Sequence, residues 1–214
     1  MKIKDKRKSD LVWNYIATVP SIANFLDQGT TLEKKLVSIY KWVRDLPFEA
    51  KLGKRDYYED LRYIITQKRG SCSPKHYLLG IICEKLGLSV RYLTYPFYWN
   101  DLDVPYPNSI KRLLKETLLS YHLAIKVHIN REEFFLDATW DPPLGKVGFS
   151  TNLMGDELMN TRNAIVPCGK PITHVNALER DKHVKKFSIK KRNIKSEIQF
   201  YIAFNDWLEQ IRNK

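Results

Sequence analysis

The stretch that decides the fold is Gly70-Ser71-Cys72-Ser73-Pro74-Lys75-His76, with the apolar run Tyr77 to Leu88 behind it. Pro74 suits the first turn of a helix, where its missing N–H costs no hydrogen bond. Glycines at both ends, Gly70 and Gly87, are typical of a tight turn and of a helix end. The sequence therefore predicts a buried helix of three to four turns with Cys72 at or just before its N-terminus. Its apolar positions recur every three to four residues: Leu78, Leu79, Ile81, Ile82 and Leu86.

The predicted position of Cys72 favours a reactive thiol. Free backbone N–H groups and the helix dipole favour negative charge at a helix N-terminus. A thiol placed there has a lowered pKa, and more of it is the nucleophilic thiolate. A lone cysteine can equally be a small buried residue that only packs, so the rest of the chain has to decide between these interpretations.

Composition limits the function classes. The 214 residues suit one domain, and 43% hydrophobic content is ordinary for a globular core. No apolar run is long enough for a transmembrane helix, and no apolar segment of a secretory signal follows the charged N-terminus. Three widely spread cysteines without a C-x-x-C pair predict neither a disulfide framework nor a structural zinc site. We therefore expect a cytoplasmic protein without a metal or other cofactor, and no calcium dependence.

The net charge of +12 is concentrated at residues 2–8 and 180–195. Such charge can bind nucleic acid, an anionic surface or an acidic substrate. No nucleic-acid-binding motif accompanies it, so a solvated, lysine-rich surface is the favoured interpretation, and nucleic-acid binding is not expected. An acidic substrate stays open, and the sequence does not indicate the oligomeric state.

The order of elements predicts an α+β fold, because helices come first and mostly antiparallel strands follow. An aromatic and proline-rich connection, residues 96–109, interrupts the strands, and connections of this length often form lids or binding loops. The predicted helices cover residues 10–19, 22–26, 31–46, 58–65, 74–86, 110–119 and 195–211, and the predicted strands cover 89–95, 121–129, 133–138, 172–178 and 187–189.

Two strand residues complete a candidate site. His122 opens the first strand of a predicted hairpin and Asp137 closes the second, with Asn130-Arg131-Glu132 as the turn. The two residues are therefore expected to be roughly cross-strand neighbours, about 5 Å apart at Cβ. That distance allows a carboxylate to orient an imidazole, which then takes the thiol proton of Cys72.

These residues resemble the transglutaminase-like superfamily, a branch of the papain-like fold. The resemblance covers roughly residues 31–141. It lies in Gly70-Ser71-Cys72, in the GIICEKLGLSVRYL run after it, in Tyr121-His122, in Leu136-Asp137-Ala138-Thr139-Trp140-Asp141, and in KLVSIYKWVRDLPF ahead of the cysteine. The chain departs from the family in the 50 residues between Cys72 and His122 and in Ser73-Pro74-Lys75-His76.

The resemblance implies that Cys72 is the nucleophile, His122 the base and Asp137 the orienting acid. It implies acyl transfer on a peptide or protein amide through a thioester, of transglutaminase, protease or amidase type. The first oxyanion donor would be the Cys72 backbone N–H, and the second a side chain ahead of it, with Gln67, Tyr58 and Trp42 as candidates. The alternatives are a non-catalytic binding or scaffold module with this fold and a basic nucleic-acid-binding protein.

Other residues have expected supporting or structural roles. His76, one helical turn after Cys72, is expected in a packing or second-shell position. Asp141 is the alternative acid. We expect aromatic residues of the substrate cleft among Tyr98, Trp99, Tyr106 and Trp140. The remaining candidates are expected to be core, surface or structural: Cys83, Cys168 with His174, His128 and His183.

We predict three segments of the chain. Residues 1–30 form an N-terminal helical extension, residues 31–179 the transglutaminase-like core, and residues 180–214 a basic C-terminal segment whose helix packs on the core.

Overall fold

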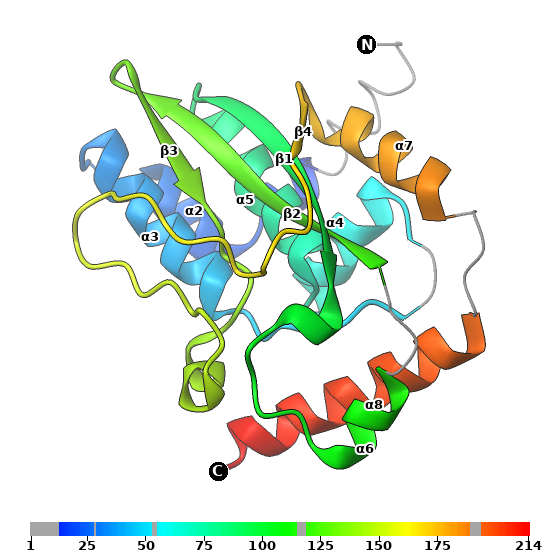
Figure 1. Ribbon diagram of the computed structural model, residues 1–214. Coiled ribbons are helices and arrows are strands. Elements are labelled where there is room, and N and C mark those ends of the chain that lie inside the picture. The colour runs from blue at the N-terminus through cyan, green and yellow to red at the C-terminus, as the bar shows by residue number, and fades with distance from the viewer. Residues whose placement is uncertain (1–12, 28, 53–54, 115–118, 189–193) are drawn as a thin grey trace.

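The computed structural model describes residues 13–27, 29–52, 55–114, 119–188 and 194–214 (Figure 1). Helices dominate the first part of the chain and an antiparallel sheet the second, so the predicted α+β class is confirmed. The elements are α2 (Pro20–Asp27), α3 (Leu32–Asp45), α4 (Tyr57–Gln67), α5 (Cys72–Lys85), β1 (Ser89–Tyr98), α6 (Asn108–Leu113), β2 (Leu119–Ile129), β3 (Glu132–Leu136), β4 (Ile172–His174), α7 (Ala177–Ser188) and α8 (Ile194–Arg212).

The sheet has the order β3-β2-β1-β4, and each neighbouring pair is antiparallel. A two-residue turn joins β2 to β3, and both of its residues, Asn130 and Arg131, have positive φ (50° and 71°). The turn is therefore shorter than predicted, and Glu132 already pairs with Ile129. The last pair of the ladder is Ile125 with Leu136. Continued by one residue, this register sets Ala124 opposite Asp137, so His122 is two residues further along the same face rather than directly across.

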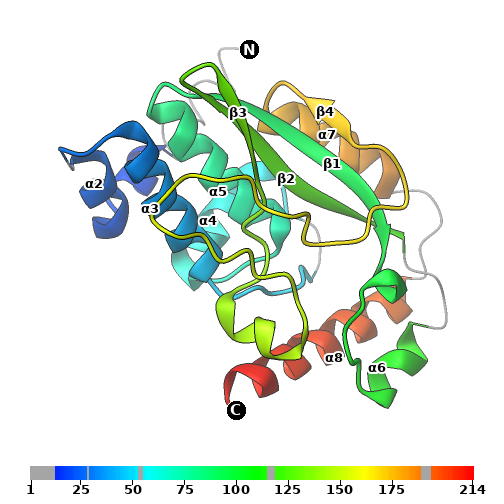
Figure 2. The same cartoon turned by 60° about the vertical axis from the view of Figure 1, so that its left-hand side comes forward.

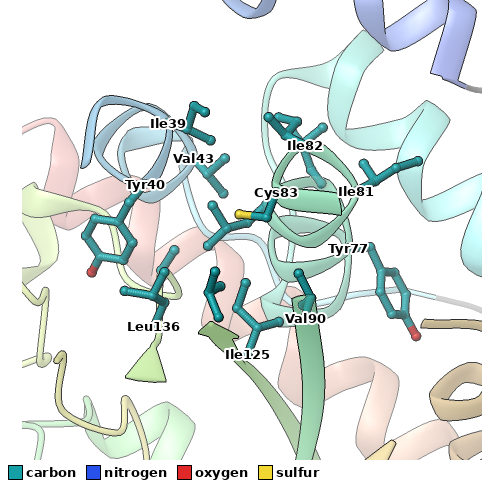
Figure 3. Packing of buried hydrophobic residues seen from close by; sticks show 14 of the residues in the cluster. Ile39, Tyr40, Val43, Tyr77, Ile81, Ile82, Cys83, Val90, Ile125 and Leu136 are labelled. Carbon is teal, nitrogen blue, oxygen red and sulfur yellow. The ribbon is translucent and has the colours of Figure 1, made fainter. Parts of the chain in front are cut away.

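The main core lies between the sheet and the helices α3, α4 and α5, which cover one of its faces (Figure 2). Its centre is α5, whose residues 74–83 are all buried. Cys83 packs in this core, as predicted, in one cluster with Val43 of α3 and Ile125 of β2 (Figure 3). Because α5 is held on both sides, the position of its first residue, Cys72, is fixed against the sheet.

Gly80 allows α5 to approach β1 closely. A Cβ atom at this position would overlap the hydroxyl of Tyr92 on β1. We expect Gly80→Ala to lower the free energy of unfolding by roughly 1–2 kcal/mol, because the overpacking cost outweighs the better helix propensity of alanine. Urea denaturation measures this change. Gly155→Ala, where no atom lies within 4 Å of the added Cβ, is the control, and an equal loss in both variants would contradict the prediction.

A second, aromatic cluster forms where α8 meets the connection after β1. Phe204 of α8 contacts Trp99, with ring centroids 5.0 Å apart, and Trp140, at 6.5 Å. Arg212, at the end of α8, pairs with both carboxylate oxygens of Asp141 at 2.8 Å. Figure 1 shows α8 and α6 below the sheet, at the end where β1 leaves it. The terminal helix thus joins the loops that follow β1 and β3.

Several predicted boundaries are wrong. The strand predicted at 172–178 ends at His174, because Asn176 accepts the backbone N–H of Glu179 and starts α7. The strand predicted at 187–189 is absent at 187–188, which belong to α7, while 189 lies outside the described residues. The helix predicted at 110–119 ends at Leu113, with 115–118 outside the described part.

The predicted first helix is described only from residue 13, and residues 13–17 are helical. The three predicted segments of the chain stay predictions, and residues 1–12 of the N-terminal extension fall outside the description. None of the helices in the described ranges combines the length and apolar content that crossing a bilayer requires.

Candidate active site

Cys72 is the first residue of α5, as the sequence predicts. The residue before it, Ser71, is extended and makes no side-chain cap, so the first N–H groups of the helix keep their hydrogen-bonding capacity. Gly70 holds this turn in place: its N–H donates to Pro47, and a Cβ here would lie 2.8 Å from the Pro74 ring. The close approach of Gly70 to Pro74 explains why glycine precedes the helix.

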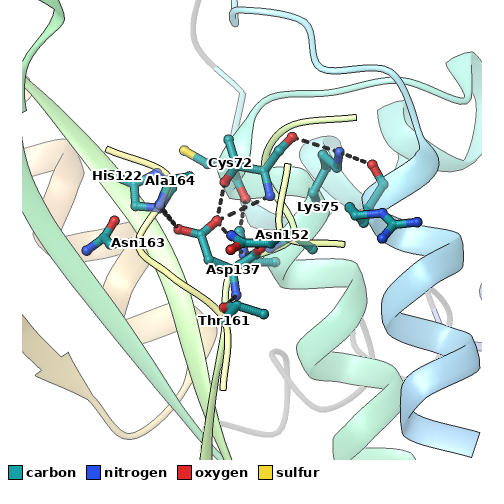
Figure 4. Close-up of polar contacts among 12 residues, drawn as sticks. Cys72, Lys75, His122, Asp137, Asn152, Thr161, Asn163 and Ala164 are labelled. Carbon is teal, nitrogen blue, oxygen red and sulfur yellow. Dashed lines mark hydrogen bonds and ion pairs between the residues drawn. The ribbon is translucent and has the colours of Figure 1, made fainter. Parts of the chain in front are cut away.

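His122 and Asp137 meet beside the thiol (Figure 4). His122 Nε2 lies 2.7 Å from Asp137 Oδ2, and both side chains are buried. The thiol of Cys72 lies near enough to His122 for the imidazole to lower its pKa, and both residues line the same cleft. Since Nε2 faces the carboxylate, Nδ1 is the ring nitrogen left for the thiol. The structure therefore brings together the three residues predicted from the sequence.

Asp137 is held by hydrogen bonds on both carboxylate oxygens. Oδ2 faces His122 and also accepts a hydrogen bond from the backbone N–H of Ala164 at 2.8 Å. Oδ1 accepts hydrogen bonds from the hydroxyl of Thr139 at 2.6 Å and from its backbone N–H at 3.2 Å. Its backbone is fixed as well, since its N–H donates to Thr161 Oγ1 at 2.8 Å. Burial by itself raises the pKa of Asp137, but His122 and Thr139 outweigh it and lower the pKa to about 2.

These contacts favour an ion pair between Cys72 and His122. Burial lowers the pKa of His122, but the Asp137 carboxylate and the hydrogen bonds to Asp137 and Cys72 raise it to about 10. Burial raises the pKa of the Cys72 thiol, but the hydrogen bond and charge of His122, with a smaller effect of Arg180, lower it overall. The two groups therefore stabilise each other as thiolate and imidazolium.

His76 connects the start of α5 to the loop that carries Asp137. Its Nδ1 lies 2.8 Å from the carbonyl of Cys72, which can only accept, and its Nε2 accepts the N–H of Ala138 at 2.9 Å. These partners fix the neutral tautomer with the proton on Nδ1. Burial lowers the pKa of His76 to about 4. This is the positioning role expected for His76, away from the reacting atoms.

Lys75 is a fully buried cation that sequence reasoning treated only as a departure from the family. Its Nζ donates to three backbone carbonyls, those of Arg44 (2.9 Å), Leu46 (2.7 Å) and Thr139 (2.8 Å). Burial lowers the pKa of Lys75 to about 7, yet three acceptors need the three N–H donors of the ammonium form. Lys75 thereby ties the end of α3 to the loop after β3.

A cleft of about 690 Å³ opens above the thiol. Cys72 and His122 line it together with Trp99 and Trp140, two of the four predicted cleft aromatics. Tyr98 and Tyr106 are not among its lining residues, and Tyr106 instead donates its hydroxyl to the carbonyl of Trp99 inside the aromatic cluster. Residues 48–60 form part of the wall with Phe48, Ala50, Lys51, Arg55 and Asp60. Another part comes from α7 and α8: Arg180, Asp181, Val184, Lys185, Glu197, Ile198 and Tyr201.

The three candidates for a second oxyanion donor do not line this cleft, which corrects that prediction. Gln67 is exposed at the end of α4, and Tyr58 packs against Tyr57 on the same helix. Trp42 packs against Phe25, with ring centroids 6.0 Å apart. These side chains lie on α3 and α4. The sequence alone does not say which face of each helix is turned toward Cys72.

The other candidate residues take structural places. Asp141 does not replace Asp137, because it accepts from Arg212 and from the N–H of Phe48. His128 is exposed and pairs with Glu133 at 2.9 Å. His183, expected to be solvated, instead packs on the buried His174 with ring centroids 4.9 Å apart.

Cys168 is exposed, and its backbone N–H donates to Pro96. His174 Nε2 faces Thr94 Oγ1 at 3.2 Å. Within the described part of the chain, no three His, Cys, Asp or Glu side chains are grouped as a metal ion would need.

Neither family models nor curated proteins match this sequence. Among solved structures, the fold is similar to a Cytophaga hutchinsonii protein described as a "Putative Cysteine Protease". The two share 14% identity with a TM-score of 0.37, over 80% of this chain. The chain spans about half, 47%, of the length of that structure.

Sequence reasoning missed the residues that hold the site together. Thr139 was visible only as part of the motif after Asp137, although a hydroxyl two residues after a buried acid is a common local partner. The N–H of Ala164 and the hydroxyl of Thr161 come from a loop without a local signal. Arg180 was counted with the basic surface but is 3% exposed and lines the cleft.

Proposed function

We propose that the protein is a cysteine-dependent acyl-transfer enzyme that acts on an amide. The observation that carries the proposal is the grouping of Cys72 with the hydrogen-bonded pair His122–Asp137 at an open cleft that Cys72 and His122 both line. The thiol stands at a helix N-terminus, where negative charge is favoured. The resemblance of the sequence to the transglutaminase-like superfamily gives the same roles to the same three residues.

The first half-reaction forms a thioester. The Cys72 thiolate attacks the amide carbonyl carbon, and a C–S bond forms while the carbonyl electrons move to oxygen. The backbone N–H of Cys72 is the donor placed to stabilise this oxyanion. The His122 imidazolium then protonates the leaving nitrogen, and the C–N bond breaks. Asp137 keeps the ring oriented and its charge balanced throughout.

The second half-reaction releases the acyl group. Neutral His122 takes a proton from water or from an amine, which attacks the thioester carbonyl. The C–S bond breaks, the thiolate leaves, and the imidazolium is restored. Water gives hydrolysis, whereas an amine gives cross-linking or amidation. Hydrolysis and transfer to an amine use the same three residues, Cys72, His122 and Asp137.

A binding module with the same fold is the second candidate. That function would be favoured by aromatic side chains filling the cleft. Instead, Phe97 and Trp99 lie along its wall, and about 690 Å³ stays open next to the thiol. Nucleic-acid binding rests on net charge alone and predicts binding that weakens steeply with salt and does not need Cys72.

The rate of Cys72 alkylation by iodoacetamide tests the proposal. At pH 6 we expect the wild-type protein to react at least ~10-fold faster than glutathione, because a free thiol with a pKa of about 8.5 is only ~0.3% thiolate there. The rate should change little as the pH rises from 6, because Cys72 is expected to be the thiolate already. Mass spectrometry assigns the modified cysteine.

Cys72→Ser is the matched control, since it leaves Cys83 in the core and Cys168 on the surface. It should remove the fast phase and leave the slow labelling of other thiols. A wild-type rate at pH 6 no faster than that of glutathione would refute the thiolate–imidazolium pair and favour the binding module.

A further inference from the structure

Arg180 is the buried cation of the cleft wall that the mechanism does not use. It lies in the first turn of α7 and is 3% exposed. Its Nη1 donates to Ser73 Oγ at 2.8 Å and to Tyr77 Oη at 2.9 Å, while its Nε faces Thr94 Oγ1 at 3.4 Å. All three acceptors are neutral hydroxyl groups. A guanidinium removed from water is costly unless charge compensates it, and the groups hydrogen-bonded to Arg180 are only dipoles, while the charges of Cys72 and Asp60 act on it without an ion pair.

The remaining guanidinium nitrogen, Nη2, has no acceptor in the described part of the chain. Nη2 of Arg180 is also not one of the sealed side-chain polar atoms of the described residues. Nη2 therefore keeps access to the cleft that Arg180 lines. It presents two N–H donors and a full positive charge close to the thiol, whose pKa it helps to lower.

Ser73 adds a donor to the same place. It follows Cys72 on α5, lines the cleft, and accepts the Arg180 N–H with its oxygen. Its own proton therefore points elsewhere and has no acceptor among the described residues. A guanidinium edge and a hydroxyl side by side match the two oxygens of one carboxylate.

The other cations of the cleft are already paired. Lys51 and Arg55 both bind Asp60, at 2.8 and 3.0 Å, and Asp60 is buried. Lys185 pairs with Asp181 at 2.7 Å. Arg180 forms no ion pair with any described carboxylate. Among the cations that line the cleft, its charge is therefore the one available to pair with a bound anion.

We propose that Arg180 and Ser73 form an anion site beside Cys72 that selects acyl donors carrying a carboxylate next to the scissile amide. The inference rests on the proposed function, and it specifies the substrate as an acidic peptide rather than a neutral one. A planar carboxylate fits the pair of donors better than a phosphate, whose three terminal oxygens would need more partners than Nη2 and one hydroxyl supply.

Two alkylating reagents of nearly equal size and the same leaving group test the site. Iodoacetate carries a carboxylate, whereas iodoacetamide is neutral. Arg180→Gln is expected to lower the ratio of the two Cys72 rate constants, iodoacetate over iodoacetamide, by at least ~10-fold, the loss of one charge-assisted hydrogen bond. A role limited to stabilising the thiolate would slow both reagents equally and leave the ratio unchanged, which would overturn the proposal.

Arg55→Gln is the matched control, because it removes the same charge from the same cleft at a residue already paired with Asp60. Its ratio should stay within about 2-fold of the wild type. An equal fall in both variants would assign the effect to the overall field of the cleft and would also overturn the site.

Competition in the wild-type protein tests the site even if Arg180→Gln does not fold. Succinate should protect Cys72 from iodoacetamide at a concentration at least ~10-fold lower than succinamide requires. Equal protection by the two, or stronger protection by inorganic phosphate, would refute a carboxylate site. A fast iodoacetamide reaction with no carboxylate preference would reject this inference alone, whereas a slow iodoacetamide reaction would reject the proposed function.

Discussion

Asp137→Asn is expected to slow the alkylation of Cys72 by iodoacetamide at pH 6 by roughly 100-fold. Without the carboxylate, burial dominates at His122 and its pKa falls from about 10, so the ring is neutral at pH 6. The Cys72 thiol then loses the cation that lowers its pKa. Only a small fraction of it is thiolate at this pH, and the rate falls in proportion.

The side-chain amide that Asp137→Asn introduces also fits poorly among the hydrogen-bond partners of the Asp137 carboxylate. Both oxygens of Asp137 accept N–H or O–H groups, from His122 and Ala164 on one side and from Thr139 on the other. Wherever the asparagine NH₂ group lies, it faces a buried donor, which costs roughly 1–3 kcal/mol in unfolding free energy. Measurements are therefore made well below the unfolding temperature, with folding followed by circular dichroism.

Asp141→Asn is the control for this variant. It removes a buried carboxylate four residues further along, which pairs with Arg212 and has no contact with His122. Stability should fall, but the rate of Cys72 alkylation should change by less than about 3-fold. If Asp137→Asn retained the wild-type rate at pH 6, Asp137 would have no part in sustaining the thiolate.

Lys75→Met is expected to lower the free energy of unfolding by about 3–5 kcal/mol. Methionine has a similar length but leaves the carbonyls of Arg44, Leu46 and Thr139 buried without their donor. Two of these carbonyls lie at the C-terminal end of α3, where no intrahelical N–H is available to replace Lys75. The midpoint of urea unfolding, with the slope unchanged, measures the loss.

Lys85→Met, in the last turn of the same helix, is the control. Lys85 is exposed and lies over the Trp13 ring at 5.2 Å, so its loss should cost less than about 1 kcal/mol. Comparable unfolding midpoints for Lys75→Met and wild type would contradict the proposed role of the buried ammonium.

The sequence predicts the site best where local patterns carry it. The apolar period of α5, with Pro74 in its first turn, places Cys72 at a helix N-terminus, and the hairpin brings His122 near Asp137. The exact register was wrong by two residues, because Asn130 and Arg131 both adopt positive φ and shorten the turn. Side chains alternate between the two faces of a strand, so a shift of two residues leaves His122 on the predicted face.

What could not be predicted depends on contacts between distant segments. The partners of Asp137 at Ala164 and Thr161 lie in a loop whose path no periodicity describes. Arg180 and Lys75 are charged residues that the composition assigns to the surface, and only the fold shows that each has buried acceptors. The oxyanion candidates on α3 and α4 failed for the same reason, since helical rotation relative to the cleft is a tertiary property.

One side of the cleft comes from α7 and α8, late in the sequence, while Cys72 and His122 come from its middle. During synthesis, Cys72, His122 and Asp137 leave the ribosome before Arg180 of α7 and Tyr201 of α8, which complete the cleft. A nascent chain can therefore bring Cys72, His122 and Asp137 together before the cleft is complete. On the proposed function, selectivity then arises later than reactivity, when α8 docks and Arg212 reaches Asp141.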